Sequence, residues 1–551
     1  MLGRRTSTLE GPRPEYPRPS LHRDRWLSLN GEWEFGAGDE PRFDRRIQVP
    51  FAPESKLSGI GASPGDVVWY RRRFDAPDAE CLLLHFGAVD YRATVWVNDV
   101  EVTRHEGGHV PFSADITEAA RDHDNVVVVR AEDRLKDKSI PRGKQHWTEK
   151  PEGIFYTPTT AIWQTVWLEP LPARHIRGLR LEPNLDAGTV NVAVSADGPA
   201  DVWIRLDGEL VGKSAEHVAG SIQLDRVEPW SPSSPRLYDV EVRLGGDRLE
   251  SYFGLRTVEA RDGKFWLNGE PILQRLVLDQ GYFVGGLMTA PSDEALRRDI
   301  ELAISFGFNG ARKHQKLEDP RWLYWADHLG FLVWAEMPSF QAHSAAAERR
   351  LAAEWSEAVR RDRDHPSIVV WVPANESFGL EKVAPEVRSK LLVRLYRLTH
   401  ELDRTRPVVS NDGWEQAVTD ICTLHDYTTP AEMALRYRTV EAALDGKASG
   451  HRPYDPGFAY RGEPMLVTEF GGAVISGSAG WGYREEGSPE QFVASYGGLI
   501  EALMQPGPVE GFCYTQLTDV EQEQNGLCTM DRVPKVAPEI IRPLTELPKR
   551  R

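Results

Sequence analysis

Cysteine is scarce in this sequence, with 4 residues (Cys81, Cys422, Cys513 and Cys528) in a chain of 551. They are widely spaced and form no CxxC pair, and the 15 histidines form no HExxH or similar cluster. Zinc sites and disulfide-stabilised folds both need a denser pattern of such residues. We therefore expect reduced thiols, no bound metal and no cofactor.

Long apolar runs are also missing. No stretch approaches the roughly 18 apolar residues that a membrane-spanning helix needs, and the segment MLGRRTSTLEGPRPEYPRPS (1–20) lacks the apolar centre of a secretion signal. The pattern predicts a cytoplasmic protein with no membrane partner.

Runs of basic residues are missing as well. The formal net charge is −17, and no run of five or more Lys or Arg residues interrupts the acidic background. A phosphate backbone would be repelled by such a surface. Nucleic acid is excluded as an expected partner, and a strongly acidic small ligand is disfavoured.

Short alternating segments fill the first half of the chain after a proline-rich leader (1–20). VVWYRRRF (67–74) and ATVWVNDVEV (93–102) alternate apolar and polar residues and are separated by Gly, Asp and Pro turns. We predict a jelly-roll β-sandwich over residues 1–171, including the leader, and an immunoglobulin-like β-sandwich over 172–256.

From residue 257 to 551 the pattern changes to apolar runs that alternate with helical segments of ten or more residues. Such alternation is typical of a (β/α)8 TIM barrel, which carries its reactive groups at the carboxyl ends of the strands. The eight predicted strands are LQRLVL (273–278), FNGAR (307–311), FLVWAE (331–336), IVVWVPANE (368–376), PVVS (407–410), DICTL (420–424), MLVTEF (465–470) and GFCYTQL (511–517).

Two glutamates end the fourth and seventh predicted strands, Glu376 in VPANES and Glu469 in LVTEFGG. Cleavage of a glycosidic bond needs one carboxyl that protonates the leaving oxygen and a second that attacks the sugar or activates water. Either residue alone could simply cap the following helix, but the two together on one barrel mouth favour catalysis. Other polar residues at strand ends that we expect to bind substrate are Asp279, Arg312, His314, Asn375, Tyr427 and Gln516.

The residues that carry a family resemblance run along nearly the whole chain. They include LNGEWEF (29–35), TTAIWQTVWLE (159–169), PWSPSSPRLYDVEV (229–242), FWLNGEPI (265–272) and RDHPSIVVWVPANES (363–377). In order and spacing the chain resembles glycoside hydrolase family 2, which contains β-galactosidases, β-glucuronidases and β-mannosidases. The resemblance implies that Glu376 is the acid/base, Glu469 the nucleophile and Tyr427 the tyrosine beside the nucleophile, with net retention at the anomeric carbon.

Three segments depart from the pattern of that family. Glu523 and Asn525 stand where β-glucuronidases of the family carry an Asn-x-Lys pair that grips the sugar carboxylate. The first barrel loop reads VLDQGY (277–282), and the second displaces its histidine by one position to His314. A glucuronide is therefore disfavoured, and galactosides in pyranoside or furanoside form remain open, as do pentosides.

We expect a retaining exo-glycosidase that acts on small glycosides or oligosaccharide ends. A catalytically silent carbohydrate-binding protein and a transglycosylase on the same scaffold are the alternatives. Trp147, in the loop RGKQHWTEKPEG (142–153), could form an aromatic platform over the barrel mouth or could lie on an exposed loop. Members of the family often assemble as dimers or tetramers, so a homo-oligomer is possible here.

Overall fold

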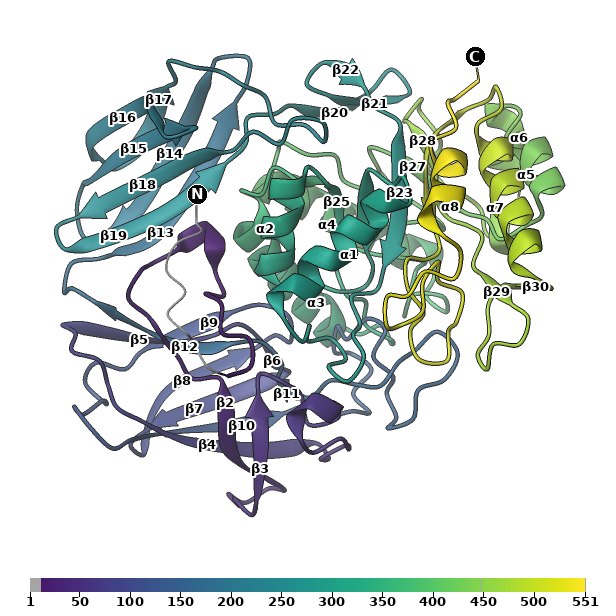
Figure 1. The fold of residues 1–551 in the computed structure, drawn as a ribbon. Coiled ribbons are helices and arrows are strands. Elements are labelled where there is room, and N and C mark those ends of the chain that lie inside the picture. Colours follow the sequence, from purple (N-terminus) through teal and green to yellow (C-terminus); the bar gives the residue numbers. More distant parts are fainter. Residues whose placement is uncertain (1–10, 447, 551) are drawn as a thin grey trace.

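The computed structural model describes residues 11–446 and 448–550, and its ribbon shows two β-rich bodies packed beside a body of mixed helices and strands (Figure 1). The predicted leader falls partly on residues 1–10, which lie outside the described residues. The predicted architecture of jelly roll, immunoglobulin-like sandwich and TIM barrel is confirmed. Among the described residues, no helix is both long and apolar enough to cross a membrane.

The first body is a sandwich of a six-stranded and a four-stranded antiparallel sheet. Alternate residues of β10 (Asn125–Glu132) are buried, because successive side chains of a strand point to opposite faces and one face covers the core. The six-stranded sheet runs β3 (Arg45–Val49), β2 (Gly31–Ala37), β4 (Val67–Phe74), β10, β7 (Arg92–Val97) and β8 (Val100–Glu106). The four-stranded sheet runs β1 (Leu27–Ser28), β12 (Val166–Leu171), β5 (Cys81–Phe86) and β9 (Phe112–Asp115), with β6 (Val89–Asp90) and β11 (Ala161–Ile162) as a separate small ladder.

The second body is a smaller sandwich of three and four antiparallel strands. Its two sheets bury their inward faces in a core of Val, Leu and Ile side chains with Tyr238 and Phe253. The strands are β13 (Ile176–Asn184), β14 (Thr189–Ala196) and β17 (Ala219–Gln223) in one sheet, and β16 (Glu209–His217), β15 (Ala200–Leu206), β18 (Tyr238–Leu244) and β19 (Asp247–Phe253) in the other.

The third body begins with a small sheet of β20 (Val258–Arg261), β21 (Lys264–Leu267) and β22 (Glu270–Pro271) and continues as the barrel. Seven parallel strands lie in the order β26, β25, β24, β23, β31, β28 and β27. Their bounds are β23 (Gln274–Asp279), β24 (Gly310–Lys313), β25 (Leu332–Glu336), β26 (Ile368–Val372), β27 (Cys422–His425), β28 (Met465–Glu469) and β31 (Val509–Tyr514). The surrounding elements are α1 (Asp293–Ser305), α2 (Pro320–Leu329), α3 (Ala345–Asp362), α4 (Pro385–Leu402), α5 (Pro430–Arg436), α6 (Val440–Asp445), α7 (Pro489–Leu503), α8 (Pro538–Thr545) and the short ladder of β29 (Ala473–Ile475) and β30 (Arg484–Glu486).

The fifth predicted strand, PVVS (407–410), is not a regular strand, and this part of the prediction is wrong. Pro407 has no N–H that could donate to a neighbouring strand. The N–H of Val408 donates to the side chain of Asp420 at 2.8 Å. The segment nevertheless closes the barrel. Val409 N donates to Trp371 O of β26 at 3.0 Å, and Asp420 N, two residues before β27, donates to Val408 O at 3.0 Å.

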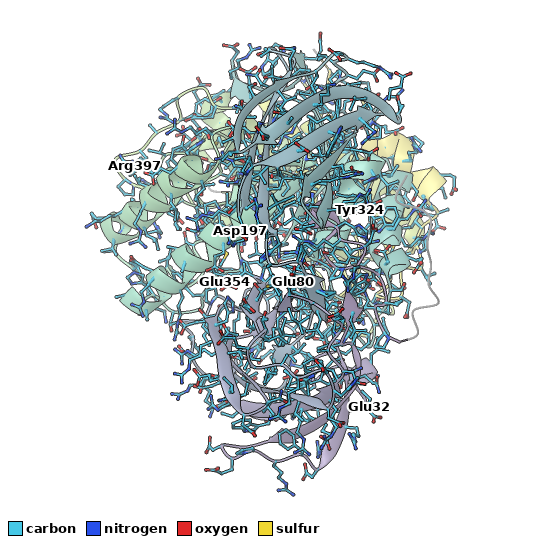
Figure 2. All side chains as sticks on the ribbon, turned by 90° about the vertical axis from the view of Figure 1, so that its left-hand side faces the viewer. Glu32, Glu80, Asp197, Tyr324, Glu354 and Arg397 are labelled. Carbon is cyan, nitrogen blue, oxygen red and sulfur yellow. The ribbon has the colours of Figure 1, made fainter. Side chains whose placement is uncertain are left out.

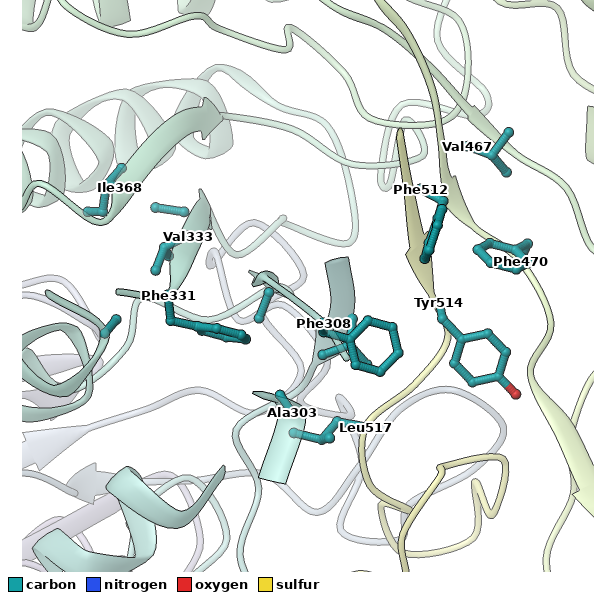
Figure 3. Packing of buried hydrophobic residues seen from close by; sticks show 14 of the residues in the cluster. Ala303, Phe308, Phe331, Val333, Ile368, Val467, Phe470, Phe512, Tyr514 and Leu517 are labelled. Carbon is teal, nitrogen blue, oxygen red and sulfur yellow. The ribbon is translucent and has the colours of Figure 1, made fainter. Parts of the chain in front are cut away.

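Aromatic and branched side chains pack between the outer face of the barrel strands and the helices around them (Figure 3). Phe470 lies edge-on to both Phe512 and Tyr514, with ring centroids 5.8 and 5.5 Å apart. Because Phe470 follows Glu469 directly, this packing fixes the end of the strand that carries the glutamate.

The jelly roll and the barrel meet along α3. Glu354 on that helix accepts a hydrogen bond of 2.7 Å from the backbone N–H of His109, and Figure 2 shows Glu354 near the middle of the molecule, close to this junction. The junction matters for function because the connection between β10 and β11, residues 133–160, extends from the jelly roll to the barrel.

Candidate active site

The carboxyl ends of four segments of the barrel bring charged side chains to one place. Glu376 follows β26, His425 ends β27, Glu469 ends β28 and Arg312 lies in β24. Parallel strands of a barrel point the same way, so side chains distant in sequence converge at its mouth.

Glu469 is buried and held at both oxygens. Arg312 Nη2 donates to Oε1 at 2.8 Å, and the Tyr427 hydroxyl donates to Oε2 at 2.7 Å. Burial alone would raise the pKa of this carboxyl, but the positive charges of His425 and Arg312 outweigh it and hold the pKa well below its usual range. Glu469 is therefore an ionised carboxylate in a fixed orientation, as a nucleophile requires.

Glu376 is the more exposed of the two glutamates, with 15% of its side chain accessible against 6% for Glu469. Its Oε1 lies 2.7 Å from His425 Nδ1, and its backbone N–H donates to Asp412 O at 3.0 Å. Its φ of 48° places it in the left-handed region, which turns the chain sharply after β26.

One oxygen of Glu376, one of Glu469 and a nitrogen of His425 all lie within 4.8 Å of one another. Retaining glycosidases hold their two carboxyl groups about 5–5.5 Å apart, whereas inverting enzymes leave about 6.5–9.5 Å for a water molecule. The short gap between these two oxygens favours the retaining arrangement over the inverting one.

His425 is fully buried between carboxylates. Its Nε2 lies 3.1 Å from Asp412 Oδ2, and its Nδ1 lies 3.6 Å from Glu469 Oε2 as well as close to Glu376. Burial would lower the pKa of the imidazole, but the three surrounding carboxylates raise it to about 10. His425 is thus a cation at neutral pH.

Arg312 is the centre of the charge network beneath the two glutamates. Besides Glu469 it binds Glu336 through Nε at 2.7 Å and Asp412 through Nη1 at 2.7 Å. Burial raises the pKa of Glu336 to about 7, because Arg312 compensates only part of the desolvation, whereas the pKa of Asp412 is lowered by Arg312 and His425 in spite of burial.

Asn375 and His314 lie beside this network. Asn375 Oδ1 accepts from Arg312 Nη2 at 2.8 Å, while its buried Nδ2 has no partner among the described residues. His314 Nδ1 lies 2.8 Å from Arg312 Nη2, and burial together with the charges of Arg312 and Lys144 lowers its pKa well below 6.5. A neutral histidine and a free amide donor suit hydroxyl groups of a sugar.

Asp279 and Gln516, two further residues predicted to bind substrate, bond to partners other than the two glutamates. Asp279 forms a buried ion pair of 2.7 Å with Lys313 and is not in the cluster around the two glutamates. Gln516 donates to Asn525 Oδ1 at 2.6 Å, and Asn525 in turn donates to Glu523 Oε1 at 3.0 Å. The structure thus gathers six of the predicted residues in one cluster: Glu376, Glu469, Asn375, Arg312, His314 and Tyr427. Gln516 instead joins a hydrogen-bonded chain with Asn525 and Glu523.

The loop of residues 133–160 reaches the barrel mouth. Its Tyr156 hydroxyl donates to Glu523 Oε2 at 2.6 Å, and its Gly153 carbonyl accepts from the indole of Trp481 at 3.1 Å. Trp147 stacks on His146, with ring centroids 4.6 Å apart, and the ammonium of Lys138 lies 4.1 Å above its ring. Trp147 therefore packs within the loop, while other residues of the loop contact the barrel.

His425 and Asp412 are members of the site that sequence reasoning missed. His425 stands two residues before Tyr427 in LHDY, and its direct attachment to the end of an apolar strand was a usable signal. Asp412, in SNDG, follows the irregular fifth segment, so no strand end pointed to it.

Comparisons with known proteins agree with this architecture. The model of the glycosyl hydrolase family 2 TIM barrel domain matches residues 258–485, the galactose-binding-like domain model of family 2 matches 50–160, and a third family 2 model matches 174–256. A β-galactosidase of Thermoanaerobacter pseudethanolicus is 26% identical over 86% of this chain, and a β-glucuronidase of Rattus norvegicus is 25% identical over 78% of this chain and 71% of its own length. The structure of a Faecalibacterium prausnitzii β-glucuronidase superposes with a TM-score of 0.80 at 23% identity, over 97% of this chain and all of that one.

Two successive β-sandwich domains, followed by a barrel with two converging glutamates, define the class as glycoside hydrolases. The chain belongs to glycoside hydrolase family 2. It spans 64% of the length of the Thermoanaerobacter enzyme, and its relatives of similar identity include both β-galactosidases and β-glucuronidases.

Proposed function

We propose that this protein is a retaining exo-glycosidase that removes a terminal sugar by double displacement, with Glu469 as nucleophile and Glu376 as acid/base. The observation that carries the proposal is the spacing of the two carboxylates, which lie within 4.8 Å of one another across the barrel mouth.

In the first half of the reaction Glu469 attacks the anomeric carbon, and Glu376 protonates the departing oxygen. Tyr427 and Arg312 each donate to a different oxygen of Glu469, so the nucleophile keeps one orientation during attack. In the second half Glu376 removes a proton from water, which attacks the same carbon from the side that the leaving group vacated. The unpaired Nδ2 of Asn375 is placed to bind a sugar hydroxyl.

His425 contacts Glu376, the residue that gives and takes the proton in the proposed mechanism. Its Nδ1 contacts Glu376 Oε1, and Asp412 holds the opposite side of the ring. The positive charge of His425 reduces the repulsion between Glu376 and Glu469, which allows both glutamates to occupy one small site.

We infer that the terminal sugar is neutral and of galactoside type, in pyranoside or furanoside form. Glu523 and Asn525 occupy the segment where uronate recognition by an Asn-x-Lys pair is expected, and a buried acid there would repel a sugar carboxylate. β-Galactosidases among the relatives support this choice, and β-glucuronidases of similar identity are the competing model.

Hydrolysis of a panel of aryl glycosides tests the proposal. The panel contains the β-galactopyranoside, β-galactofuranoside, α-L-arabinofuranoside, β-mannoside and β-glucuronide, and the first-formed anomer is read by NMR. We expect retention and a preference for a neutral sugar. Glu376→Ala should lower turnover by about 10²–10⁴-fold, and Glu469→Ala should abolish it.

The exposed Glu381, in the loop after Glu376, provides a matched control. Glu381→Ala should keep the wild-type rate. An inverted product, or wild-type rates in both catalytic variants, would refute the mechanism, and a preference for the glucuronide would refute the choice of sugar.

A further inference from the structure

A nearly buried lysine from the jelly roll lies at the barrel mouth without a protein partner. Lys144, in the loop of residues 133–160, is 6% exposed. Within the described ranges, 11–446 and 448–550, its ammonium forms no ion pair and donates no hydrogen bond. Burying an ammonium costs free energy unless its three donors find acceptors, so an ammonium with no acceptor among these residues can donate to a ligand.

The surroundings of Lys144 belong to the proposed sugar site. Its Nζ lies 5.5 Å from the ring centroid of Phe378, two residues after Glu376, and 5.9 Å from that of Phe155. The Lys144 charge also acts on two buried groups of the barrel. Burial raises the pKa of Glu523, and the charge of Lys144 is the main charge that opposes this rise. Burial and Arg312 lower the pKa of His314, and the charge of Lys144 lowers it further.

The backbone on either side of Lys144 is fixed to the barrel. Gly143 N donates to Ser339 O at 3.0 Å, and Gly143 O accepts from the side chain of Gln341 at 2.9 Å. Tyr156 N donates to Lys144 O at 2.8 Å, which closes the loop on itself. The lysine is therefore delivered to the barrel mouth by a positioned backbone rather than by a free surface loop.

Glu523 gives the complementary charge. Its two oxygens accept from the Tyr156 hydroxyl at 2.6 Å and from Asn525 Nδ2 at 3.0 Å, so the carboxyl is oriented by one residue from each domain. The Lys144 ammonium and the Glu523 carboxyl form no ion pair with each other. They can therefore bind two hydroxyl groups of the same sugar, because the lysine donates and the glutamate accepts.

We propose that Lys144 is a specificity-determining residue that donates a hydrogen bond to a hydroxyl oxygen of the terminal sugar, with Glu523 accepting from a second hydroxyl. The proposal rests on the proposed function, because it needs a glycoside in the barrel mouth. It selects neutral polyhydroxylated sugars, since Glu523 disfavours a uronate even though Lys144 alone would attract one.

The test compares Lys144→Met with Lys138→Met on the preferred aryl glycoside. Lys138 lies on the same loop but is exposed, and its ammonium lies over the ring of Trp147. We expect kcat/KM to fall about 10–100-fold in Lys144→Met, as for the loss of a charged hydrogen bond, and to stay within twofold of wild type in Lys138→Met.

Singly deoxygenated versions of the same glycoside identify the contact. For the analogue that lacks the hydroxyl bound by Lys144, the wild type and Lys144→Met should have equal kcat/KM, whereas all other analogues keep the difference. Glu523→Gln should show the same insensitivity for a different hydroxyl. A purely structural lysine would instead depress kcat/KM by the same factor for every analogue, and that result would overturn the proposal.

The outcomes also separate this proposal from the proposed function. Wild-type protein inactive on every glycoside would refute the function itself. Wild-type activity with an unchanged kcat/KM in Lys144→Met would leave the glycosidase intact and refute the lysine contact. A wild-type preference for the glucuronide that is lost in Lys144→Met would also leave the glycosidase intact, but it would reassign the lysine to a sugar carboxylate and refute the hydroxyl contact.

Discussion

At the scale of single residues, the unusual member of the site is the cation His425. It is surrounded by three acids, Glu376, Glu469 and Asp412, and Arg312 lies 3.5 Å from its Nε2. The acids outnumber the cations in this cluster, so the protonated ring stabilises the folded state.

The pH dependence of stability should show this contribution. The pKa of His425 rises from 6.5 to about 10 on folding, so its contribution is complete below pH 6.5 and is lost as the pH rises through about 10. We expect the free energy of unfolding of the wild type to decline by a few kcal/mol over this window, measured by urea unfolding at pH 6, 8 and 9.5. His425→Asn should lack that part of the decline, and parallel curves for both proteins would contradict the assignment.

The convergence of Glu376 and Glu469 was predictable because each glutamate stands at or just past the end of an apolar strand. Asn375, Arg312 and Tyr427 were predictable for the same reason, and the structure places all three within the cluster. The protonation of His425 was not predictable, because it depends on three acids from separate segments that meet only in the folded barrel. Asp279 and Lys144 show the same limit, since the chain does not reveal which charged group already has a partner.

At the scale of elements, the periodicity located seven barrel strands within a few residues of their observed bounds. The prediction of the fifth strand was wrong because the N–H of Val408 donates to the side chain of Asp420 instead of to a neighbouring strand. The contact of the loop of residues 133–160 with the barrel could not be derived from pattern. It depends on paired backbone groups such as Gly143 and Ser339, which carry no sequence signature.

Gly143 tests whether that contact is needed for activity. Its φ is 58°, and a Cβ there would lie 2.3 Å from the carbonyl oxygen of Gln315. Gly143→Ala should push the loop away from the barrel and lower kcat/KM by about tenfold or more, because small displacements of binding groups are costly to catalysis. Steady-state kinetics on the preferred glycoside gives the measurement.

Gly153 is a matched control on the same loop. It also has a φ of 58°, but a Cβ there would meet nothing within 4 Å. Gly153→Ala carries the same backbone penalty without the collision, so it should lose far less activity. Equal losses in the two variants would show that backbone strain, rather than the collision with Gln315, is responsible.

At the scale of the whole molecule, a buried charge cluster joins the segment before β1 to both sandwiches. Glu169 of β12 accepts from Tyr16 at 2.6 Å, Arg18 at 2.9 Å and Arg23 at 2.8 Å. Arg23 also binds Asp247 of β19 at 3.0 Å. The relative placement of the two sandwiches therefore depends on charges rather than on apolar packing alone.

Glu169→Ala should be strongly destabilising, because it leaves two arginines near the domain junction without this carboxylate. Loss of one partner from a buried ion pair typically costs about 3–5 kcal/mol. The exposed Glu209→Ala serves as control and should stay within about 0.5 kcal/mol of wild type. Denaturant unfolding of both variants gives the comparison, and an equally small change in both would show that the cluster is dispensable.

The left-handed backbone at Glu376 favours glycine for stability, whereas the proposed function requires a carboxyl side chain there. With a φ of 48°, a residue that has a Cβ is strained by about 1–2 kcal/mol, and Ser377 after it has a φ of 51°. Glu376→Gly should therefore have a higher free energy of unfolding than Glu376→Ala, measured by denaturant unfolding. The expected difference is up to about 1 kcal/mol after the greater entropy of glycine in the unfolded chain is subtracted. Both variants lack the Glu376 carboxyl, so the comparison isolates the backbone strain. Equal stabilities would show that the turn relaxes in both variants. Under the proposed function, activity requires a side chain at a position where the fold alone would favour glycine.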